Sequence, residues 1–408
     1  MPAVLNAARG ALRSPALRSA ALLAAGGGGF ALGNLLLARV LPVREYGVVA
    51  LLLSLIQVGA ALGSLGLPTL VNRHALRATG QLLRYSLWLA ALAGLASAAV
   101  ALFFYRLPTV IASILAIAVA AAALGRIPAA VLQSRQRFGA SLLLTQVHNW
   151  LLLASVPLLL VTDQRSATAV LLFILLCYLI TTCLGWTAAR DQDSTAGSLT
   201  PRMLWSEGLS AAGFGLAFNL FLQLDRIVIG DVLSLEDLAA YSLVASIAGS
   251  PFRMLQISAG HTLVPQLRAA ANRNAALALL RRESLLMIGM SALAAPALFV
   301  LTPWLIRWIA GSATDAGYVL AAAVIVVGFV RLWQGLASAV VNAVGTAREL
   351  VILSTLGWGA IAIAVALANM TSSHGLGAVV YSLGAGWCVV AIGATTLACK
   401  ALARLQPE

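Results

Sequence analysis

Apolar residues follow one another in long runs along this chain, and polar residues gather in short stretches between the runs. The runs are continuous, unlike the ten-residue alternating segments of a membrane β-barrel, and therefore favour helices. A helix rises about 1.5 Å per residue, so roughly 20 apolar residues cross a hydrocarbon core of about 30 Å. We predict twelve transmembrane helices, near residues 19–39, 46–70, 85–105, 108–132, 139–161, 167–189, 206–230, 238–262, 285–309, 316–343, 350–369 and 375–398.

Composition supports the same conclusion. Of the 408 residues, 61% are hydrophobic and 10% are charged, whereas an average soluble domain carries about 25% charged residues. A chain with so few charges cannot cover a water-facing surface. The sequence therefore predicts an all-α membrane protein.

The charged residues indicate an orientation in the membrane. The formal charge is +13, from 26 Lys and Arg against 13 Asp and Glu. With the N-terminus inside, seventeen of the basic residues fall in the tails and inward connections, five in the outward connections and four within spans. Basic segments are retained in the cytoplasm. We therefore predict a multi-pass membrane protein with both termini cytoplasmic, and no nucleic-acid partner.

The longest polar connection, "ARDQDSTAGSLTPR" at 189–202, divides the chain into halves of nearly equal length. It predicts two lobes of six helices joined by a cytoplasmic linker. The expected organisation is a cytoplasmic segment at 1–18, an N-lobe at 19–189, a linker at 190–205, a C-lobe at 206–399 and a tail at 400–408.

The two halves also resemble each other. "PVREYGVVAL" at 42–51 matches "SLEDLAAYSL" at 234–243 at an offset of 192, and each places a short acidic turn before a long helix. A weaker echo pairs 131–138 with 340–347. An even number of helices per half makes these parallel repeats, which favour two pseudo-symmetric lobes around a central cavity and transport by alternating access.

Two stretches resemble a known family. "LLLARVLPVREYGVVALLLSLIQVGAALGSLGLPTLVNRHA" at 35–75 and "NLFLQLDRIVIGDVLSLEDLAAYSLVASI" at 219–247 are similar to the helices that open the two halves of the polysaccharide transporters. These are Wzx-type flippases, in the superfamily of the MATE extruders and lipid II flippases. The resemblance implies a two-lobed MATE-like fold. It also implies movement of an undecaprenyl-diphosphate-linked glycan to the outer leaflet, with membrane lipids and polysaccharide assembly proteins such as a polymerase as partners.

Three arginines are predicted deep within spans: Arg126, Arg253 and Arg331. A charge at mid-helix costs about 2.5 to 3.5 kcal/mol, so each needs a partner or a function. Arg253 and Arg331 lie roughly 22 Å below their outer helix ends, and Arg126 roughly 27 Å below. Guanidinium matches phosphate oxygens with two donors and keeps its charge when desolvated. We expect the three to line the cavity and bind the diphosphate; the alternative is that they reach the interface or bond backbone carbonyls.

Asp225 and Arg226 are adjacent charges in the seventh predicted helix. They lie only a turn or two from its outer end, and adjacent helical residues point about 100° apart, so we expect separate partners. An outer gate and a structural lock are both open. The polar residues Gln223, Gln256, Gln334 and Asn342 are candidate glycan contacts, with helix-to-helix hydrogen bonding as the alternative.

The acidic residues bear on the competing functions. None lies inside the first six predicted helices, where cation-coupled drug extruders of the superfamily use one, so a multidrug exporter is the weaker hypothesis. A membrane glycosyltransferase, such as a polymerase or ligase, would need a sizeable outward loop with catalytic groups, and the predicted outward loops are short. We expect a non-enzyme. No two histidines have ligand spacing and the cysteines lie in apolar runs, so neither a metal nor a cofactor is expected.

Overall fold

The computed structural model describes residues 15–74, 76–190, 208–270, 272–310 and 317–405. Every regular element in these ranges is a helix. Ten helical segments of the described residues are long and apolar enough to cross a membrane. The predicted all-helical membrane fold is confirmed. The remaining two predicted spans, 19–39 and 206–230, correspond to α2 and α10 and fall partly on residues whose side chains are outside the described part.

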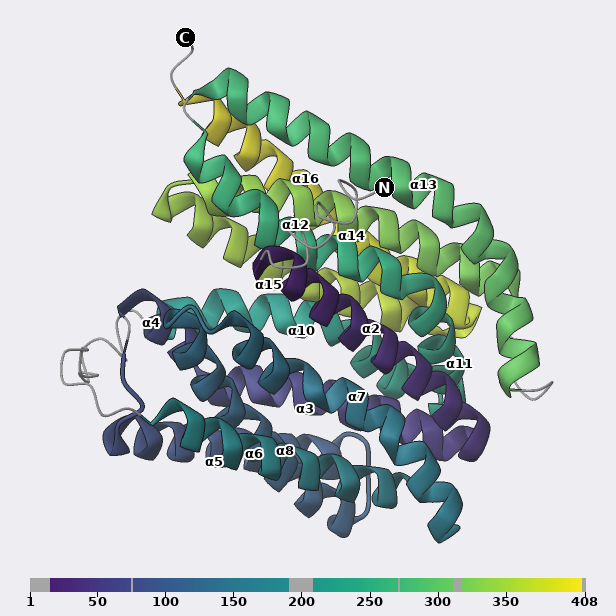
Figure 1. The fold of residues 1–408 in the computed structure, drawn as a ribbon. Helices are drawn as coiled ribbons and strands as arrows, with labels where there is room; N and C mark the ends of the chain where they lie inside the picture. The colour runs from purple at the N-terminus through teal and green to yellow at the C-terminus, as the bar shows by residue number, and fades with distance from the viewer. Residues whose placement is uncertain (1–14, 75, 191–207, 271, 311–316, 406–408) are drawn as a thin grey trace, which may run out of the picture. The chain divides into compact units, whose positions relative to one another are not determined.

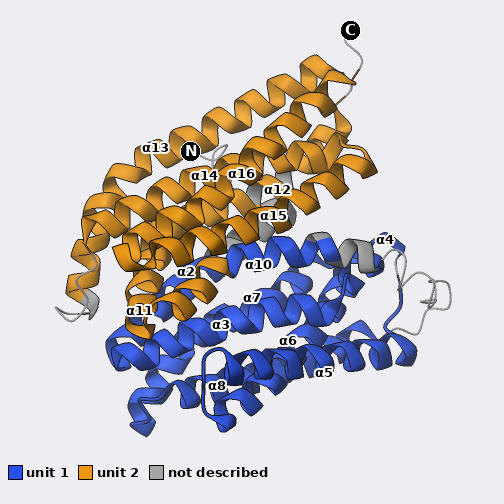
Figure 2. Cartoon of the chain, turned by 180° about the vertical axis from the view of Figure 1, so that it is seen from behind, with its two compact units in different colours: residues 1–223 blue, residues 224–408 orange. Residues whose placement is uncertain are grey.

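The chain forms two compact units, residues 1–223 and 224–408 (Figure 2). The first contains α2 Pro15–Val40, α3 Val43–Ser64, α4 Leu67–His74, α5 Gly80–Phe103, α6 Thr109–Ser134, α7 Phe138–Thr162, α8 Ala167–Ala189 and the start of α10 Leu209–Val232. The second contains the end of α10, α11 Leu235–Val244, η2 Ala245–Gly249, α12 Ser250–Ala269, α13 Arg273–Ala310, α14 Tyr318–Val344, α15 Ala347–Thr371, η3 Ser372–His374 and α16 Leu376–Ala403 (Figure 1). Most of the predicted linker, 191–205, lies outside the described residues, and that boundary and the cavity between lobes stay predictions.

Each unit is organised around one helix. In the first unit, α6 packs against α3, α5, α7 and α8, and α4 also lies on it. In the second unit, α14 packs against α12, α13 and α16. These two central helices carry Arg126 and Arg331. Both arginines therefore lie on the helix with the most helical neighbours, away from the edge of its unit.

Three predicted spans differ in detail from the structure. The predicted helix at 46–70 ends at Ser64, because Leu65 and Gly66 adopt left-handed backbone angles (φ 38° and 71°) and a new helix, α4, starts at Leu67. Glycine tolerates that conformation without steric cost. The predicted helix at 238–262 is interrupted by the π-helical turn η2, and α13 begins at Arg273, before the predicted residue 285. The pattern of apolar residues does not predict these features. The break at Leu65–Gly66 and the turn η2 lie inside apolar stretches, and the first turns of α13 precede its apolar run.

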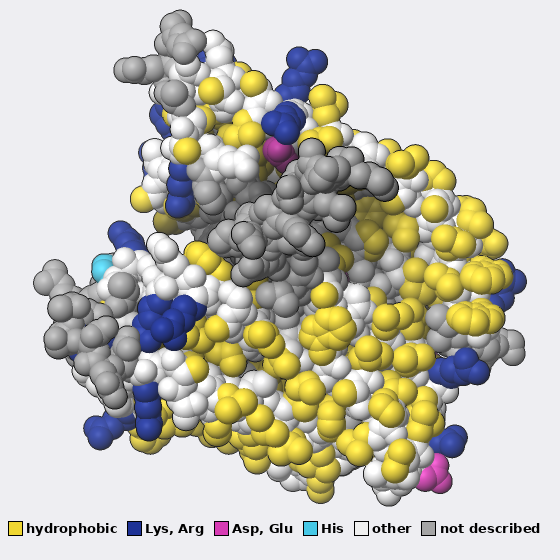
Figure 3. All heavy atoms as spheres, viewed as in Figure 1, with side chains coloured by type: hydrophobic (Ala, Val, Ile, Leu, Met, Phe, Trp, Pro, Cys, Tyr) yellow, Lys and Arg dark blue, Asp and Glu magenta, His cyan; other side chains and the backbone are white. Residues whose placement is uncertain are grey.

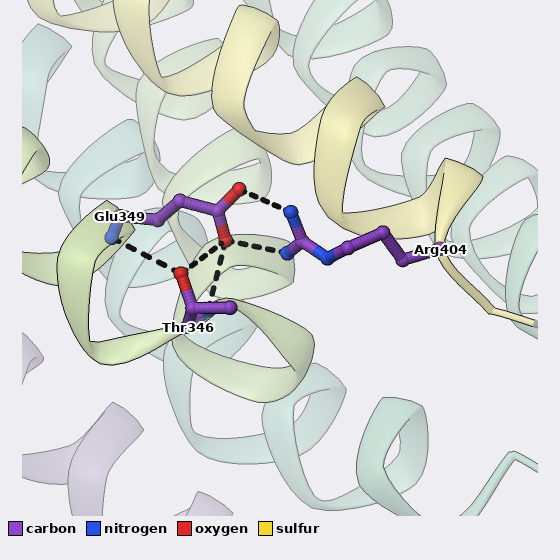
Figure 4. A network of polar contacts seen from close by, with 3 residues as sticks. All are labelled: Thr346, Glu349 and Arg404. Carbon is purple, nitrogen blue, oxygen red and sulfur yellow. Dashed lines mark hydrogen bonds and ion pairs between the residues drawn. The ribbon is translucent and has the colours of Figure 1, made fainter.

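Three polar residues, Thr346, Glu349 and Arg404, form a hydrogen-bonded group that we call the polar latch (Figure 4). Thr346 and Glu349 form a capping box at the start of α15. The same carboxylate receives both guanidinium ends of Arg404, at 2.7 and 2.6 Å, from the residue that follows α16. Hydrogen bonding to Glu349 raises the pKa of the Arg404 guanidinium above its ordinary value. The latch joins the first turn of α15 to the last turn of α16.

Apolar side chains dominate the visible face of the molecule, and Lys and Arg gather at its margins (Figure 3). Exposed large residues include Trp304 and Trp308 of α13, which stack with parallel rings 6.2 Å apart. A soluble protein rarely exposes so wide an apolar surface. The surface is the one expected of a chain surrounded by lipid.

Candidate functional site

A carboxylate and an arginine form an ion pair inside the second unit. Asp225 Oδ2 on α10 lies 2.9 Å from Arg331 Nη2 on α14, and the two side chains are 8% and 13% exposed. The same oxygen accepts a hydrogen bond from the Tyr241 hydroxyl on α11. The other oxygen, Oδ1, accepts the backbone N–H of Arg226 at 3.1 Å. Three helices thus converge on one carboxylate.

Arg331 has a donor that the ion pair does not use. Its Nε is buried and has no hydrogen-bond partner among the described residues. The guanidinium carbon lies 5.0 Å from the centre of the Trp387 ring on α16, a cation–π contact. Buried polar atoms are nearly always hydrogen-bonded. Arg331 therefore keeps a buried donor that no acceptor among the described residues satisfies.

Two further arginines surround this pair. Arg226 follows Asp225 on α10 and is buried. Arg253 on α12 lies within electrostatic range of Arg226, Arg331 and Asp225. We call these four residues, Asp225, Arg226, Arg253 and Arg331, the arginine cluster. Its three guanidinium groups and one carboxylate leave a positive excess, and such an excess in a poorly solvated place attracts anions.

The backbone between Tyr241 and Arg253 explains how α12 approaches α14. Pro251 lacks an N–H and cannot complete the α-helical ladder, and the π-helical turn η2 lies directly before it. Gly328 on α14 is the point of closest approach: a Cβ built there would lie 2.6 Å from Phe252 Cγ. The missing side chain lets Phe252, which is buried, seat against α14. Arg253 is the next residue on α12.

A pair of buried amides lies one helical turn further along both helices. Gln256 Nε2 donates to Gln334 Oε1 at 2.9 Å, and Gln334 Nε2 donates to Ser338 Oγ at 2.7 Å. Gln256 Oε1 is buried without a hydrogen-bond partner among the described residues. Gln256 follows Arg253 by three residues, and Gln334 follows Arg331 by three, so each amide shares a helix face with an arginine of the cluster.

The other two predicted glycan contacts, Asn342 and Gln223, lie on α14 and α10. Asn342, near the end of α14, accepts a hydrogen bond from Arg268 Nη2 through its backbone oxygen at 3.0 Å. Gln223 is buried on α10, two residues before Asp225, and its Oε1 has no hydrogen-bond partner within the described part of the chain. Asn342 is thus engaged through its backbone, whereas Gln223 retains an unused acceptor.

The first unit holds its arginine differently. Arg126 Nη2 on α6 donates to the side-chain and backbone oxygens of Gln57 on α3, both at 3.3 Å. Gln57 Nε2 lies 3.5 Å from His148 Nε2 on α7, whose ring is 5.3 Å from the ring of Tyr178 on α8. Four helices meet at this group, which we call the Arg126 group. The hydrogen-bond acceptors that the structure gives Arg126 are neutral.

No cluster of three or more His, Cys, Asp or Glu side chains with the geometry of a metal site is found among the described residues. The two groups are therefore described by their organic side chains: guanidinium donors, amides and one carboxylate. Both groups contain guanidinium N–H donors, which are chemically suited to oxygen-rich anions.

The model of the polysaccharide biosynthesis protein family matches residues 36–316 of the chain. The chain belongs to this family. The match includes α10, α11 and α12, and with them Asp225, Arg226 and Arg253, as well as Arg126 of the first unit. A search of the curated proteins gives no match.

Solved structures of transporters share the fold. A multidrug resistance MATE family transporter of the MOP superfamily, in an inward-facing conformation, is similar at a TM-score of 0.69 with 13% identity, over 92% of this chain and 94% of that one. The lipid II flippase MurJ, in an inward closed conformation, gives 0.65 with 13% identity over 93% and 86%. A MOP superfamily transporter from Pyrococcus furiosus gives 0.58 with 13% identity over 98% of both chains. The resemblance that the sequence indicated is confirmed for family and fold.

One prediction about the site is corrected. The sequence placed Asp225 near the outer end of its helix and Arg331 at or below the midplane, as separate groups, whereas the structure joins them at 2.9 Å. Counting residues along a helix gives the level of the Cα atom only. An arginine side chain is long and points toward the N-terminal end of its helix. For Arg331 that direction is toward the start of α14, which in the predicted topology is the outer side.

Several residues of the two groups were not singled out from the sequence. Tyr241 lies in the repeat segment at 234–243, but nothing in that pattern indicates its hydroxyl contact with Asp225. The position of Trp387 in the sequence, by contrast, could have indicated its role. Tryptophan is enriched at membrane interfaces, and Trp387 lies well inside α16, where it is 2% exposed. A mid-span tryptophan in a chain with mid-span arginines is a reason to look for a cation–π pair.

Proposed function

We propose that this protein is a flippase for an undecaprenyl-diphosphate-linked oligosaccharide. It moves the lipid from the inner to the outer leaflet for the synthesis of a surface polysaccharide such as O-antigen, capsule or exopolysaccharide. Membership of the polysaccharide biosynthesis family supports the pathway. The fold, shared with a lipid II flippase, supports the type of activity.

The observation that carries the proposal is the arginine cluster. Arg331 is paired with the carboxylate of Asp225 and keeps a buried, unused Nε donor. Arg226 is the residue next to Asp225, and Arg253 lies within electrostatic range of the pair. A diphosphate group bears negative charge and several acceptor oxygens, and it must be stripped of water to cross the hydrocarbon core. Arginine suits that task because its charge persists on desolvation and its planar donors bind phosphate oxygens in pairs.

We propose the following substrate-binding roles for the predicted site residues. Arg253 and Arg331 of the second unit, and Arg126 of the first, are the proposed diphosphate-binding residues. Gln256 and Gln334, one turn beyond the arginines, offer amides to the first sugar hydroxyls, and Gln223 and Asn342 extend the polar set. We propose alternating access of the two units as the transport cycle, in the bacterial inner membrane with both termini cytoplasmic.

A cation-coupled multidrug exporter is the alternative, and Asp225 is the observation that favours it. Coupling to protons or sodium requires a carboxylate that can exchange its cation. Asp225, however, is held by Arg331 and Tyr241, and such partners favour the charged form of a carboxylate. The same pairing leaves positive charge in excess around it, which suits an anionic substrate better than a cationic drug.

A membrane glycosyltransferase is the less favoured third hypothesis. Its catalytic groups would stand in loops on the outer side. In the predicted orientation the outward connections between described helices are short, such as 41–42 between α2 and α3 and 233–234 between α10 and α11. They offer little room for an active site.

The proposal is tested by deleting the gene in its host and separating the lipid-linked intermediates. We expect an undecaprenyl-diphosphate-linked glycan to accumulate on the inner leaflet and the surface glycan to be lost. Plasmid-borne wild type restores the glycan, whereas Arg253→Ala and Arg331→Ala fail to do so at equal protein levels.

Three results would count against this account or a part of it. A normal surface glycan in a strain that lacks every related gene contradicts the flippase. Sensitivity of the deletion strain to cationic drugs, with an intact glycan, supports the exporter. Full activity of both arginine variants removes the diphosphate site while leaving the flippase open.

A further inference from the structure

The position that an anion would take beside Arg331 is filled by the protein's own carboxylate. Asp225 engages one guanidinium nitrogen, Nη2, at 2.9 Å. Nε, which lies on the same edge of the guanidinium plane, is buried and has no acceptor among the described residues. A phosphate group binds such an edge with two oxygens at once. The ion pair therefore uses half of a site that a phosphate group would use in full.

The charge balance points the same way. Without substrate, Arg331 would be an uncompensated charge in a membrane span, which is costly. Asp225 offsets that charge, but Arg226 and Arg253 still leave the cluster with two more guanidinium groups than carboxylates. A diphosphate joined to a lipid at one end and a sugar at the other carries one negative charge on each phosphate. The two negative charges of the bound substrate would thus offset the excess of guanidinium groups in the cluster.

We propose that Asp225 is an internal anion that occupies Arg331 in the empty transporter and is displaced when a polyprenyl diphosphate binds. This proposal rests on the proposed function and adds to it a means by which the bound diphosphate is released. Tyr241 holds Asp225 through its hydroxyl, so the carboxylate stays hydrogen-bonded while Arg331 turns to the phosphate oxygens. When the substrate is to leave, Asp225 takes back Arg331 and stabilises the empty site. Asp225 therefore weakens binding and speeds release.

Direct binding to the purified full-length protein in detergent tests this device, with radiolabelled farnesyl diphosphate as the probe. Asp225→Asn keeps the shape and the hydrogen bond to Tyr241 but removes the competing charge. We expect it to bind the probe roughly tenfold or more tightly than wild type, the effect of one charge-assisted hydrogen bond. The matched control is Asp231→Asn, an exposed residue of the same helix, which should bind like wild type.

A double variant keeps the test decisive if Asp225→Asn fails to fold. Asp225→Asn combined with Arg331→Gln removes one charge of each sign, so the net charge of the cluster is unchanged. If the phosphate binds at Arg331, the double variant binds the probe roughly tenfold more weakly than wild type. Binding equal to wild type would mean that net charge alone attracts the probe, and it would overturn the proposal.

The outcomes separate this inference from the proposed function. Wild-type binding with no gain in Asp225→Asn overturns the displacement while the diphosphate site stands. Absence of probe binding in wild type and both variants counts against the diphosphate site itself. Unlabelled inorganic pyrophosphate and phosphatidylglycerol vesicles are the competitors: equal competition by phosphatidylglycerol assigns the site to a lipid headgroup and overturns the proposal.

Discussion

At the scale of single residues, the choice of arginine at position 331 is explained by the number and direction of its donors. One nitrogen bonds Asp225, the face of the guanidinium lies against Trp387, and Nε stays unused. A lysine would offer a point charge without the planar edge or the stacking face. Charge alone therefore does not reproduce this site.

Substitution of Arg331 separates these contributions. We expect Arg331→Ala to abolish complementation of the deletion strain, and Arg331→Lys to retain only a small fraction of it, because lysine keeps the charge but loses the paired donors. Surface glycan per cell, at matched protein levels, is the measurement. Arg165→Ala is the control, since Arg165 is 59% exposed and pairs with an exposed Asp163. Wild-type glycan with Arg331→Lys would show that charge suffices.

In the Arg126 group, a carboxylate can be added next to an arginine whose hydrogen-bond acceptors in the structure are neutral. Arg126 is held by the neutral Gln57, so Gln57→Glu would give it a carboxylate partner much like the one Arg331 already has. We expect the variant to be at least as thermally stable as wild type but to produce less surface glycan, because the new carboxylate competes for Arg126. Gln57→Met, which has no charge, is the control for lost hydrogen bonding. An unchanged glycan level in Gln57→Glu would exclude Arg126 from the substrate path.

At the scale of elements, close packing between α12 and α14 sets the positions of the cluster residues. Gly328 admits the ring of Phe252, and Gly335 lies against Gln256, so glycines of α14 occupy two of its contacts with α12. Small residues at helix contacts are the general means by which membrane helices approach each other. The π-helical turn η2 adds to this, because it changes the register between Tyr241 and Arg253.

A methyl group at Gly328 tests this packing. Gly328→Ala would place Cβ 2.6 Å from Phe252 Cγ, so the ring or the helix must shift. We expect a loss of about 1–3 kcal/mol in stability, as for other overpacked cores, measured as a lower Tm in detergent. Gly359→Ala on α15 has nothing within 4 Å of its Cβ and should leave the Tm unchanged or slightly higher. Equal Tm values for the two variants would contradict the packing argument.

The elements also show what the sequence can predict and where it stops. Each span was visible because lipid requires a long apolar helix, whatever its neighbours. The break at Leu65–Gly66 and the turn η2 were not visible, since they depend on local backbone geometry inside apolar stretches. For the site, the arginines and Asp225 stood out by their cost in a membrane. Their pairing did not, because it depends on which helices lie side by side and on the direction of each side chain.

At the scale of the whole molecule, the two units hold arginine in contrasting ways. The second unit pairs Arg331 with a carboxylate, and the first gives Arg126 neutral acceptors. In the proposed cycle the two units therefore differ in how strongly each keeps an anion: Arg126 is ready to bind one, whereas Arg331 must first give up Asp225.

The central claim is that this protein moves a polyprenyl-diphosphate-linked saccharide across a bilayer. The most direct measurement uses the purified protein in liposomes that contain a fluorescent saccharide linked to a polyprenyl diphosphate, with a membrane-impermeant quencher added outside. We predict that wild type exposes inner-leaflet probe to the quencher over time and that Arg331→Ala liposomes behave like empty ones. Equal quenching in wild-type and empty liposomes, with correctly inserted protein, would contradict the account.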